Sequence, residues 1–392
     1  MSDVCTDDKF VSSFLLNTCQ SGRRLTIEAI LALDCYVQVH VGKLPASSDD
    51  DDVGLIAAKT GSVAEFYIRP MLSCVGDIDI MYYRNSTLAI PTGTAPPTQL
   101  PGEFHSRVVV FEIVDSEFPG YVYLVSSYLL TECINDDKYK AIECPRMYAH
   151  YKYDATDSTR HGPAFTASED TGLTVWGQIS GRLSGSYISN DDVYCLRCLS
   201  WPTQAAHWQS RHRNYGWPDS ATIDHVVNNN GCDVVMVAHR RCRRDQWMNT
   251  RQFRLSFSRA EVVLLNCWIP VQQIVYHMLR VFVKVERLTE NANNSDGATL
   301  SNYHIKTLML WACELKPRSW WIDDLNLVRL CVELLHTLGD WLSDVRCPHY
   351  FIHNCNLLTY PDDWCCSLMQ VASRLMSETA ASLSEWFIAK MF

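Results

Sequence analysis

The feature that most restricts the fold of this chain is a change in the spacing of its apolar residues. In the first part, short segments rich in Val, Phe and Tyr, such as 108–114 and 121–127, are typical of strands. Later, apolar residues recur every three or four positions, most regularly over 327–342, as on one face of a helix. We therefore predict an α/β lobe with an N-terminal helix over residues 1–230 and a helical lobe over residues 231–392.

Other segments fit this division. Strands are expected at 77–83, 186–199 and 233–238, one long helix or a broken pair at 12–44, a helix at 270–288 with Pro270 in its first turn, and a helix N-cap at Asp323 or Asp324.

Composition excludes several classes of protein. A formal net charge of −10 over 392 residues argues against a general nucleic-acid coat, although a local basic face remains open. We find neither a basic start followed by an apolar run nor an apolar stretch of membrane-spanning length. The 17 cysteines lie mainly in apolar contexts, as reduced core residues do. We therefore expect a cytoplasmic protein with no membrane partner.

Two short motifs carry chemistry. In Lys59-Thr60-Gly61-Ser62, glycine lets backbone N–H groups approach a phosphate and serine adds a donor, although most Gly-Ser pairs only form turns. Asp77 and Asp79 are two apart on an expected strand, so their carboxylates share a side. Such a pair suits Mg²⁺ or Mn²⁺, and the alternative is a solvated strand face.

The order of the two motifs along the chain strengthens their interpretation as parts of one site. A Gly-Ser turn followed by a strand with Asp-x-Asp is the arrangement of polymerase-β-type nucleotidyltransferases. These enzymes need a third carboxylate on a neighbouring strand, and Asp191 or Asp192 can supply it. Two metal ions on three carboxylates lower the pKa of an attacking hydroxyl and neutralise the leaving pyrophosphate.

Further segments together resemble one family, the male-abnormal (Mab-twenty-one) family, which includes cyclic GMP–AMP synthase and the animal receptors similar to it. The segments are 59–65, 162–164, 191–202, 211–218, 254–261, 301–307 and 347–352. The resemblance implies a bilobed fold, with a polymerase-β-like α/β nucleotidyltransferase lobe, an α-helical C-terminal lobe and nucleotides in a central cleft.

The resemblance also implies residue roles. Metal ligands and catalytic residues would be Asp77, Asp79 and Asp191, with Asp192 in place of Asp191 if the register shifts. Nucleotide contacts would come from Thr60, Gly61, Ser62, Arg254, Ser256, Ser258, Glu261, Arg280, Ser301 and Tyr303. Ser62 would touch the donor triphosphate, Arg254 and Arg280 would pair with phosphate oxygens, and Tyr303 would stack on a base.

The expected activity is the joining of two nucleoside triphosphates into a cyclic dinucleotide, a second messenger in innate immunity. The synthase carries a zinc-binding insertion with a histidine and clustered cysteines, called the zinc thumb. This insertion is not expected here, because residues 266–276 continue without it and contain only one cysteine, Cys267. Animal receptors without the thumb resemble RNA sensors, so double-stranded RNA is the expected activator, and a homodimer is compatible with the sequence. The alternatives are a catalytically inactive binding or developmental protein and a general polynucleotide polymerase.

The strongest basic run is a candidate nucleic-acid face. It comprises Arg240, Arg241, Arg243 and Arg244, with Arg23, Arg24, Arg211 and Arg213 as further candidates. The alternative is a solvated loop after a strand.

Two further groups have metal-like spacing. Cys195 and Cys198 form one, and Cys347, His349, His353 and Cys355 form the other. The first lies in an expected strand, and the resemblance makes the second a structural signature of the helical lobe.

Overall fold

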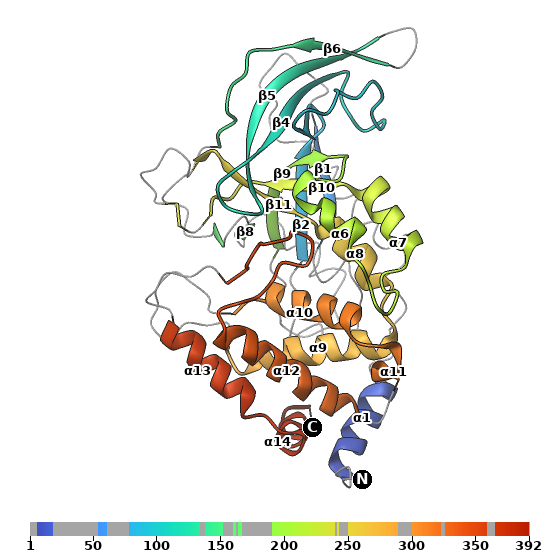
Figure 1. Cartoon of the computed structure of the whole chain (residues 1–392), viewed down its shortest axis with the longest axis vertical. Coiled ribbons are helices and arrows are strands. Elements are labelled where there is room, and N and C mark those ends of the chain that lie inside the picture. Colours follow the sequence, from blue (N-terminus) through green and yellow to red (C-terminus); the bar gives the residue numbers. More distant parts are fainter. Residues whose placement is uncertain are drawn as a thin grey trace, which may run out of the picture.

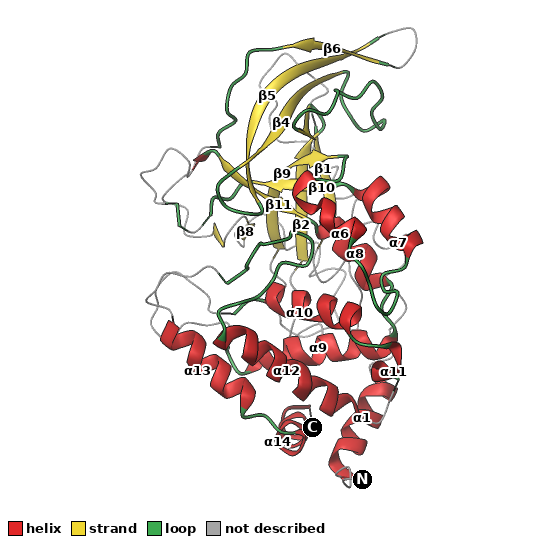
Figure 2. Cartoon of the chain, in the orientation of Figure 1, coloured by secondary structure: helices red, strands yellow, loops and turns green. Residues whose placement is uncertain are grey.

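The computed structural model describes residues 6–18, 54–60, 78–133, 138–151, 160–161, 164–166, 190–239, 241–242, 250–288, 300–322, 326–358 and 365–391. Within them, the strands gather in one part of the molecule and most of the helices in another (Figures 1 and 2). The fold is therefore bilobed, as the sequence predicted.

The first lobe is built on one mixed sheet, in the order β1-β2-β9-β10-β11-β5-β4-β3. The described strands are β1 (Leu55–Thr60), β2 (Ile78–Arg84), β3 (Thr87–Pro91), β4 (Arg107–Asp115), β5 (Tyr121–Glu132), β6 (Tyr139–Glu143), β7 (Arg160–His161), β8 (Ala164–Thr166), β9 (Asn190–Cys198), β10 (Cys232–Val235) and β11 (Gln252–Ser256). The strands predicted at 108–114, 121–127, 186–199 and 233–238 are confirmed, with shifted ends.

Strand β9 joins the parts of this sheet. It pairs in parallel with β2 and antiparallel with β8 and β10. Its last residue, Cys198, also pairs with Ala89 of β3, the strand at the far end of the path. The sheet therefore curls until strand β3 meets β9.

The two faces of the sheet bury separate cores, because successive side chains of a strand point to opposite faces. Val193 and Cys195 of β9 face a core between the curled strands, which also contains Val110 of β4. Leu196 and Cys198 face the larger core that continues into the helices. The larger core therefore binds the sheet to the second lobe.

The described helices are α1 (Thr6–Thr18), α6 (Ala206–Ser210), α7 (Ser220–His225), α8 (Ser258–Asn266), α9 (Pro270–Val285), α10 (Asn302–Leu315), α11 (Arg318–Trp321), α12 (Leu327–Ser343), α13 (Cys365–Met376) and α14 (Ala380–Met391). Pro270 occupies the first turn of α9, and the apolar face of α12 is buried, so both helix predictions are confirmed. Asp323 and Asp324, the predicted caps, lie outside the described residues, and so do residues 19–44 of the predicted first helix.

The spatial division differs from the predicted boundary after residue 230. Strands β10 and β11 follow that point but lie within the sheet. Helix α1 packs on α9, α12 and α14, and the buried Asp8 accepts a hydrogen bond of 2.5 Å from Ser384 of α14. Sheet pairing and the packing of α1 are contacts between distant segments, so a change in local periodicity cannot reveal them.

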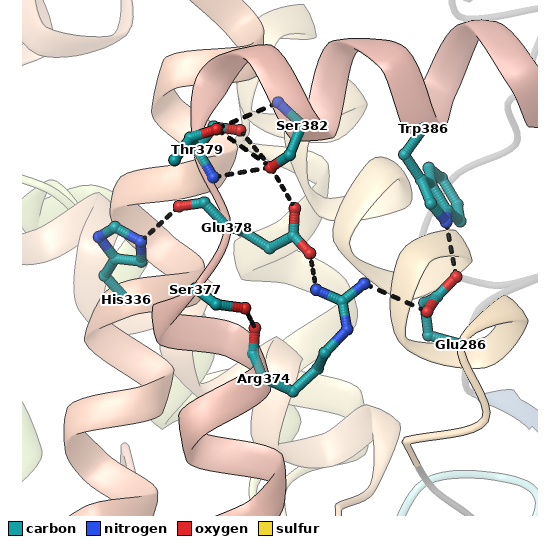
Figure 3. Close-up of polar contacts among 8 residues, drawn as sticks. All are labelled: Glu286, His336, Arg374, Ser377, Glu378, Thr379, Ser382 and Trp386. Atoms are coloured by element: carbon teal, nitrogen blue, oxygen red, sulfur yellow. Dashed lines mark hydrogen bonds and ion pairs between the residues drawn. The ribbon is translucent and has the colours of Figure 1, made fainter.

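Figure 3 shows the polar network that fixes the last two helices. Arg374 of α13 forms ion pairs with Glu378 and with Glu286, which follows α9. Trp386 of α14 also donates to Glu286, at 2.6 Å. His336 of α12 donates through Nε2 to the Glu378 carbonyl at 2.8 Å. The network joins helices α9, α12, α13 and α14.

Candidate active site

The register of three neighbouring strands aligns the polar positions that the sequence singled out. Thr60, the last residue of β1, pairs with Asp79 of β2, and Asp79 pairs with Asp191 of β9. Asp192 is instead opposite Ile80. Because paired positions of neighbouring strands share a face of the sheet, positions 79 and 191 share one face and position 192 lies on the other. Gly61, Ser62 and Asp77 lie outside the described residues.

The second group of predicted residues lies where β11 passes directly into α8. Arg254 and Ser256 are in β11, and Ser258 begins α8. The Ser256 hydroxyl donates to the Ser258 hydroxyl at 3.4 Å. The Ser258 hydroxyl lies 2.9 Å from the sulfur of Met81, two residues after Asp79 in β2. The start of α8 therefore lies against the strand that carries Asp79.

A buried ion pair holds α8 in this position. The Asp233 carboxylate of β10 is fully buried, and Arg259 of α8 donates to it through Nε at 2.9 Å. Arg197, which is opposite Asp233 in the sheet, lies 3.7 Å away on the other side of the carboxylate. Since a buried carboxylate needs compensating charge, these contacts fix the helix on the sheet and so position Ser258 and Glu261.

Glu261 connects the two lobes. It is 3% exposed, and its carboxylate accepts from Lys306 of α10 at 3.0 Å. Tyr303 lies one turn earlier on α10, whose N-cap is Ser301. The charges of Glu261, Lys306 and Arg254 all act on the Tyr303 hydroxyl. The structure thus brings Arg254, Glu261 and Tyr303 together where the lobes meet.

Burial determines the protonation of this cluster. It raises the pKa of Tyr303 well above its usual value, and the nearby Glu261 carboxylate adds to the effect. Burial also lowers the pKa of His349, which lies 3.2 Å from the Tyr303 hydroxyl, to about 3, with Arg254 contributing. Both groups are therefore neutral at physiological pH.

Arg280, the predicted phosphate ligand on α9, lies in a different environment. The side chain is 3% exposed, and its guanidinium carbon lies 5.4 Å from the centre of the Tyr276 ring. The structure thus buries Arg280 within the helical lobe.

The basic run is described only in part. Arg241 is exposed, whereas Arg240, Arg243 and Arg244 lie outside the described residues. The buried His239 anchors the start of the run, because its ring stacks on Phe118 with the ring centres 3.9 Å apart.

Two other arginines proposed for the nucleic-acid face instead form ion pairs inside the protein. Arg211 and Arg213 lie 2.6 and 3.5 Å from Glu314 of α10, which is 3% exposed and also accepts from Tyr350 at 2.8 Å. The side chain of Arg213 is only 6% exposed. The prediction that these two arginines contribute to a surface grip on phosphate is wrong, because a buried carboxylate on the other lobe binds them.

The alternative zinc sites gain no support. Cys347 and His349 are buried, and the Cys355 thiol donates to the Pro119 carbonyl at 3.4 Å. Cys195 and Cys198 are buried in β9 on opposite faces of the sheet. Across the ranges that the structure describes, no group of three or more His, Cys, Asp and Glu side chains is arranged to hold a metal ion.

Sequence reasoning did not predict the contacts of three residues that shape the site. They are Lys306, which pairs with Glu261, His349, which contacts Tyr303, and Glu314, which binds two arginines of the other lobe. Lys306 and His349 lie within segments that carry the resemblance. Their partners are distant in sequence, so no local pattern identifies the contacts.

Comparison with known proteins agrees with this architecture. Residues 129–267 match the family model described as the Mab-21 protein nucleotidyltransferase domain, and residues 272–374 match the Mab-21 protein HhH/H2TH-like domain. A protein from Aedes aegypti named mab-21-like is 29% identical over 168 residues, which is 40% of this chain and 40% of that relative. The match therefore spans less than half of the relative's length. None of the helices in the described ranges has the length and apolar character to cross a lipid bilayer.

Proposed function

This chain belongs to the Mab-21 family and carries its nucleotidyltransferase domain, and on that basis we propose that it is a metal-dependent enzyme that joins two nucleoside triphosphates into a cyclic dinucleotide. The observation that carries this proposal is the pairing of Asp79 with Asp191, beside the start of α8. Two aligned acidic positions on adjacent strands, next to a segment with Arg254 and Ser258, suit a nucleotide whose phosphates bind through metal ions.

The residues present fit such metal ions. Paired positions on neighbouring strands are about 5 Å apart, a spacing at which two acidic residues can share a cation. Hard oxygen donors are the ligands that Mg²⁺ and Mn²⁺ prefer. Asp79 and Asp191 would hold the metal together with Asp77. The bound metal would lower the pKa of the attacking ribose hydroxyl and neutralise charge on the departing pyrophosphate.

The remaining residues of the site would bind and orient the nucleotides. The Arg254 guanidinium suits bidentate contact with phosphate oxygens. One oxygen of Glu261 accepts from Lys306, and the other would accept from a base edge. Tyr303 offers an aromatic face for stacking. Arg254 and Glu261 come from the sheet lobe and Tyr303 from the helical lobe, so a nucleotide bound between the lobes would contact all three.

The activating ligand and the biological role rest on the family resemblance alone. We propose double-stranded RNA as the activator, with the exposed Arg241 and its basic neighbours in contact with phosphates. The product would act as a second messenger in innate immunity.

The test is to incubate the full chain with Mn²⁺ or Mg²⁺, ATP and GTP, with and without a long RNA duplex. Products are then identified by mass spectrometry. Asp79→Asn and Asp191→Asn are expected to abolish product, whereas the matched Asp192→Asn, on the opposite face, is expected to retain it. Equal activity of Asp191→Asn and wild type would refute the metal arrangement. A chain that binds nucleotide but yields no product over a broad ligand panel would instead be the non-catalytic binding protein.

A further inference from the structure

His349 is a buried histidine whose ring is held on both sides. It lies after α12 and is 7% exposed. Its Nδ1 accepts from the backbone N–H groups of Phe351 at 3.0 Å and Ile352 at 3.1 Å. Its Nε2 lies 3.2 Å from the hydroxyl oxygen of Tyr303. The main chain is fixed too, because the His349 N–H donates to the Cys355 carbonyl at 2.8 Å.

These contacts determine the tautomer of His349. A ring nitrogen that receives two N–H donors carries no proton, so Nδ1 is the acceptor. The imidazole is neutral, because burial and the nearby Arg254 lower its pKa to about 3. The single ring proton therefore resides on Nε2. It follows that Nε2–H donates to the Tyr303 hydroxyl oxygen, and that the tyrosine's own O–H remains free to point to another acceptor.

The arrangement constrains Tyr303 from outside its own helix. Tyr303 lies in the first turn of α10, and its hydroxyl oxygen is 3.2 Å from His349, which follows α12. One turn later, Lys306 ties α10 to Glu261 of the sheet lobe. The backbone of α10 and the ring of Tyr303 are thus fixed by two separate contacts, one to each neighbouring segment.

We propose that His349 is a positioning residue for nucleotide binding: its hydrogen bond to the tyrosine hydroxyl fixes the Tyr303 ring for stacking on a base. The proposal rests on the proposed function, because it takes a nucleoside triphosphate as the occupant of the cleft. A ring that is already fixed in the binding orientation loses less conformational freedom when a base stacks on it, which strengthens binding.

Two substitutions test the hydrogen bonds of Nδ1 and Nε2 separately. In His349→Asn, the side-chain oxygen can replace Nδ1 as acceptor for Phe351 and Ile352 but cannot reach Tyr303. In His349→Gln, the longer amide can reach Tyr303 but does not replace Nδ1. Tyr303→Phe removes the hydroxyl and retains the ring.

Binding of Mg²⁺-ATP and Mg²⁺-GTP is measured by calorimetry for each full-length variant. His349→Asn is expected to weaken binding about two- to tenfold, the effect of one lost hydrogen bond. His349→Gln is expected to bind more tightly than His349→Asn. The double variant His349→Asn, Tyr303→Phe is expected to bind no more weakly than Tyr303→Phe alone, because both changes break the same contact.

Wild-type affinity in His349→Asn, or fully additive losses in the double variant, would overturn the proposal. Nitrogen chemical shifts of ¹⁵N-histidine-labelled wild-type protein give a second measurement that needs no variant. They are expected to show the Nε2–H tautomer for His349, and an Nδ1–H tautomer would overturn the assignment. A wild-type chain that binds neither nucleotide would refute the proposed function, and the positioning role with it, even if the tautomer is as expected.

Discussion

Replacing Glu314 with Gln is expected to lower the free energy of unfolding by about 3 kcal/mol, because the carboxylate compensates two buried guanidinium groups. Glu314 lies on α10, in the helical lobe, and its partners Arg211 and Arg213 follow α6 in the sheet lobe. The substitution changes charge with little change in shape. It therefore tests the ion pairs that join the lobes and leaves the packing intact.

The magnitude follows from burial and from the contacts that remain. Removing one partner of a buried ion pair costs about 3–5 kcal/mol, and the Arg211 and Arg213 side chains are only 14% and 6% exposed. The lower end applies because Arg211 keeps its hydrogen bond to the Tyr350 carbonyl at 2.9 Å. Its guanidinium also remains over the Trp311 ring, 4.3 Å from the ring centre.

The assay is equilibrium unfolding in guanidinium chloride, followed by tryptophan fluorescence. The matched control is Arg329→Gln, which removes an exposed ion pair to Glu333 within α12 and is expected to cost about 0.5 kcal/mol or less. In the double variant Glu314→Gln, Arg213→Gln, the loss is expected to be smaller than the sum of the single losses. A loss for Glu314→Gln no larger than that of the control would refute the reasoning.

Three further predictions concern the stability of the fold. Burial lowers the pKa values of His277 and His349 to about 3, so the unfolded chain binds protons more readily than the folded chain. The stability that results is complete above about pH 6.5 and falls as the pH is lowered towards 3, with a loss of about 2 kcal/mol per histidine at pH 5. The loss is measured as a drop in the denaturant midpoint, and His349→Asn is expected to make that drop smaller. Gly231→Ala should destabilise the chain by at least about 2 kcal/mol in the same assay, because φ is +55° and the new methyl group would lie 2.2 Å from the Cys198 carbonyl oxygen; wild-type stability would contradict this. Val345, a β-branched residue with φ of 49°, follows the last turn of α12. Val345→Gly should therefore raise the unfolding temperature, with a gain in stability of about 0.5–1 kcal/mol, and an unchanged or lower unfolding temperature would contradict this.

Much of the fold could be predicted because its signals are local. The alternation of β4 and the helical spacing of α12 each depend on residues within a few turns of one another, and both elements are found where expected. The predicted boundary after residue 230 reflects the same limitation, since local periodicity changes there while β10 and β11 still pair with distant strands. The spacing of apolar residues therefore could not predict which strands pair with one another.

The candidate site could likewise be predicted only where the signal is local in sequence. Acidic residues at 77, 79 and 191 and the segment at 254–261 could be chosen by residue type and order. Whether Asp191 or Asp192 shares a face with Asp79 is a question of strand register, which is fixed by pairing over more than a hundred residues of chain. The role of Arg211 likewise could not be predicted, because a charged side chain looks the same in sequence whether water or a buried carboxylate surrounds it.

By itself, the sequence determined which segments become strands and helices and which residue types can bind metal and nucleotide, since backbone propensity and side-chain chemistry are local properties. Only the tertiary structure decided that Asp191 is opposite Asp79, that α1 packs on the helical lobe, and that Tyr303 meets His349. These facts depend on register and on contacts between distant segments. Such contacts are selected when the whole chain buries its apolar surface and compensates its buried charges, and no local pattern encodes them.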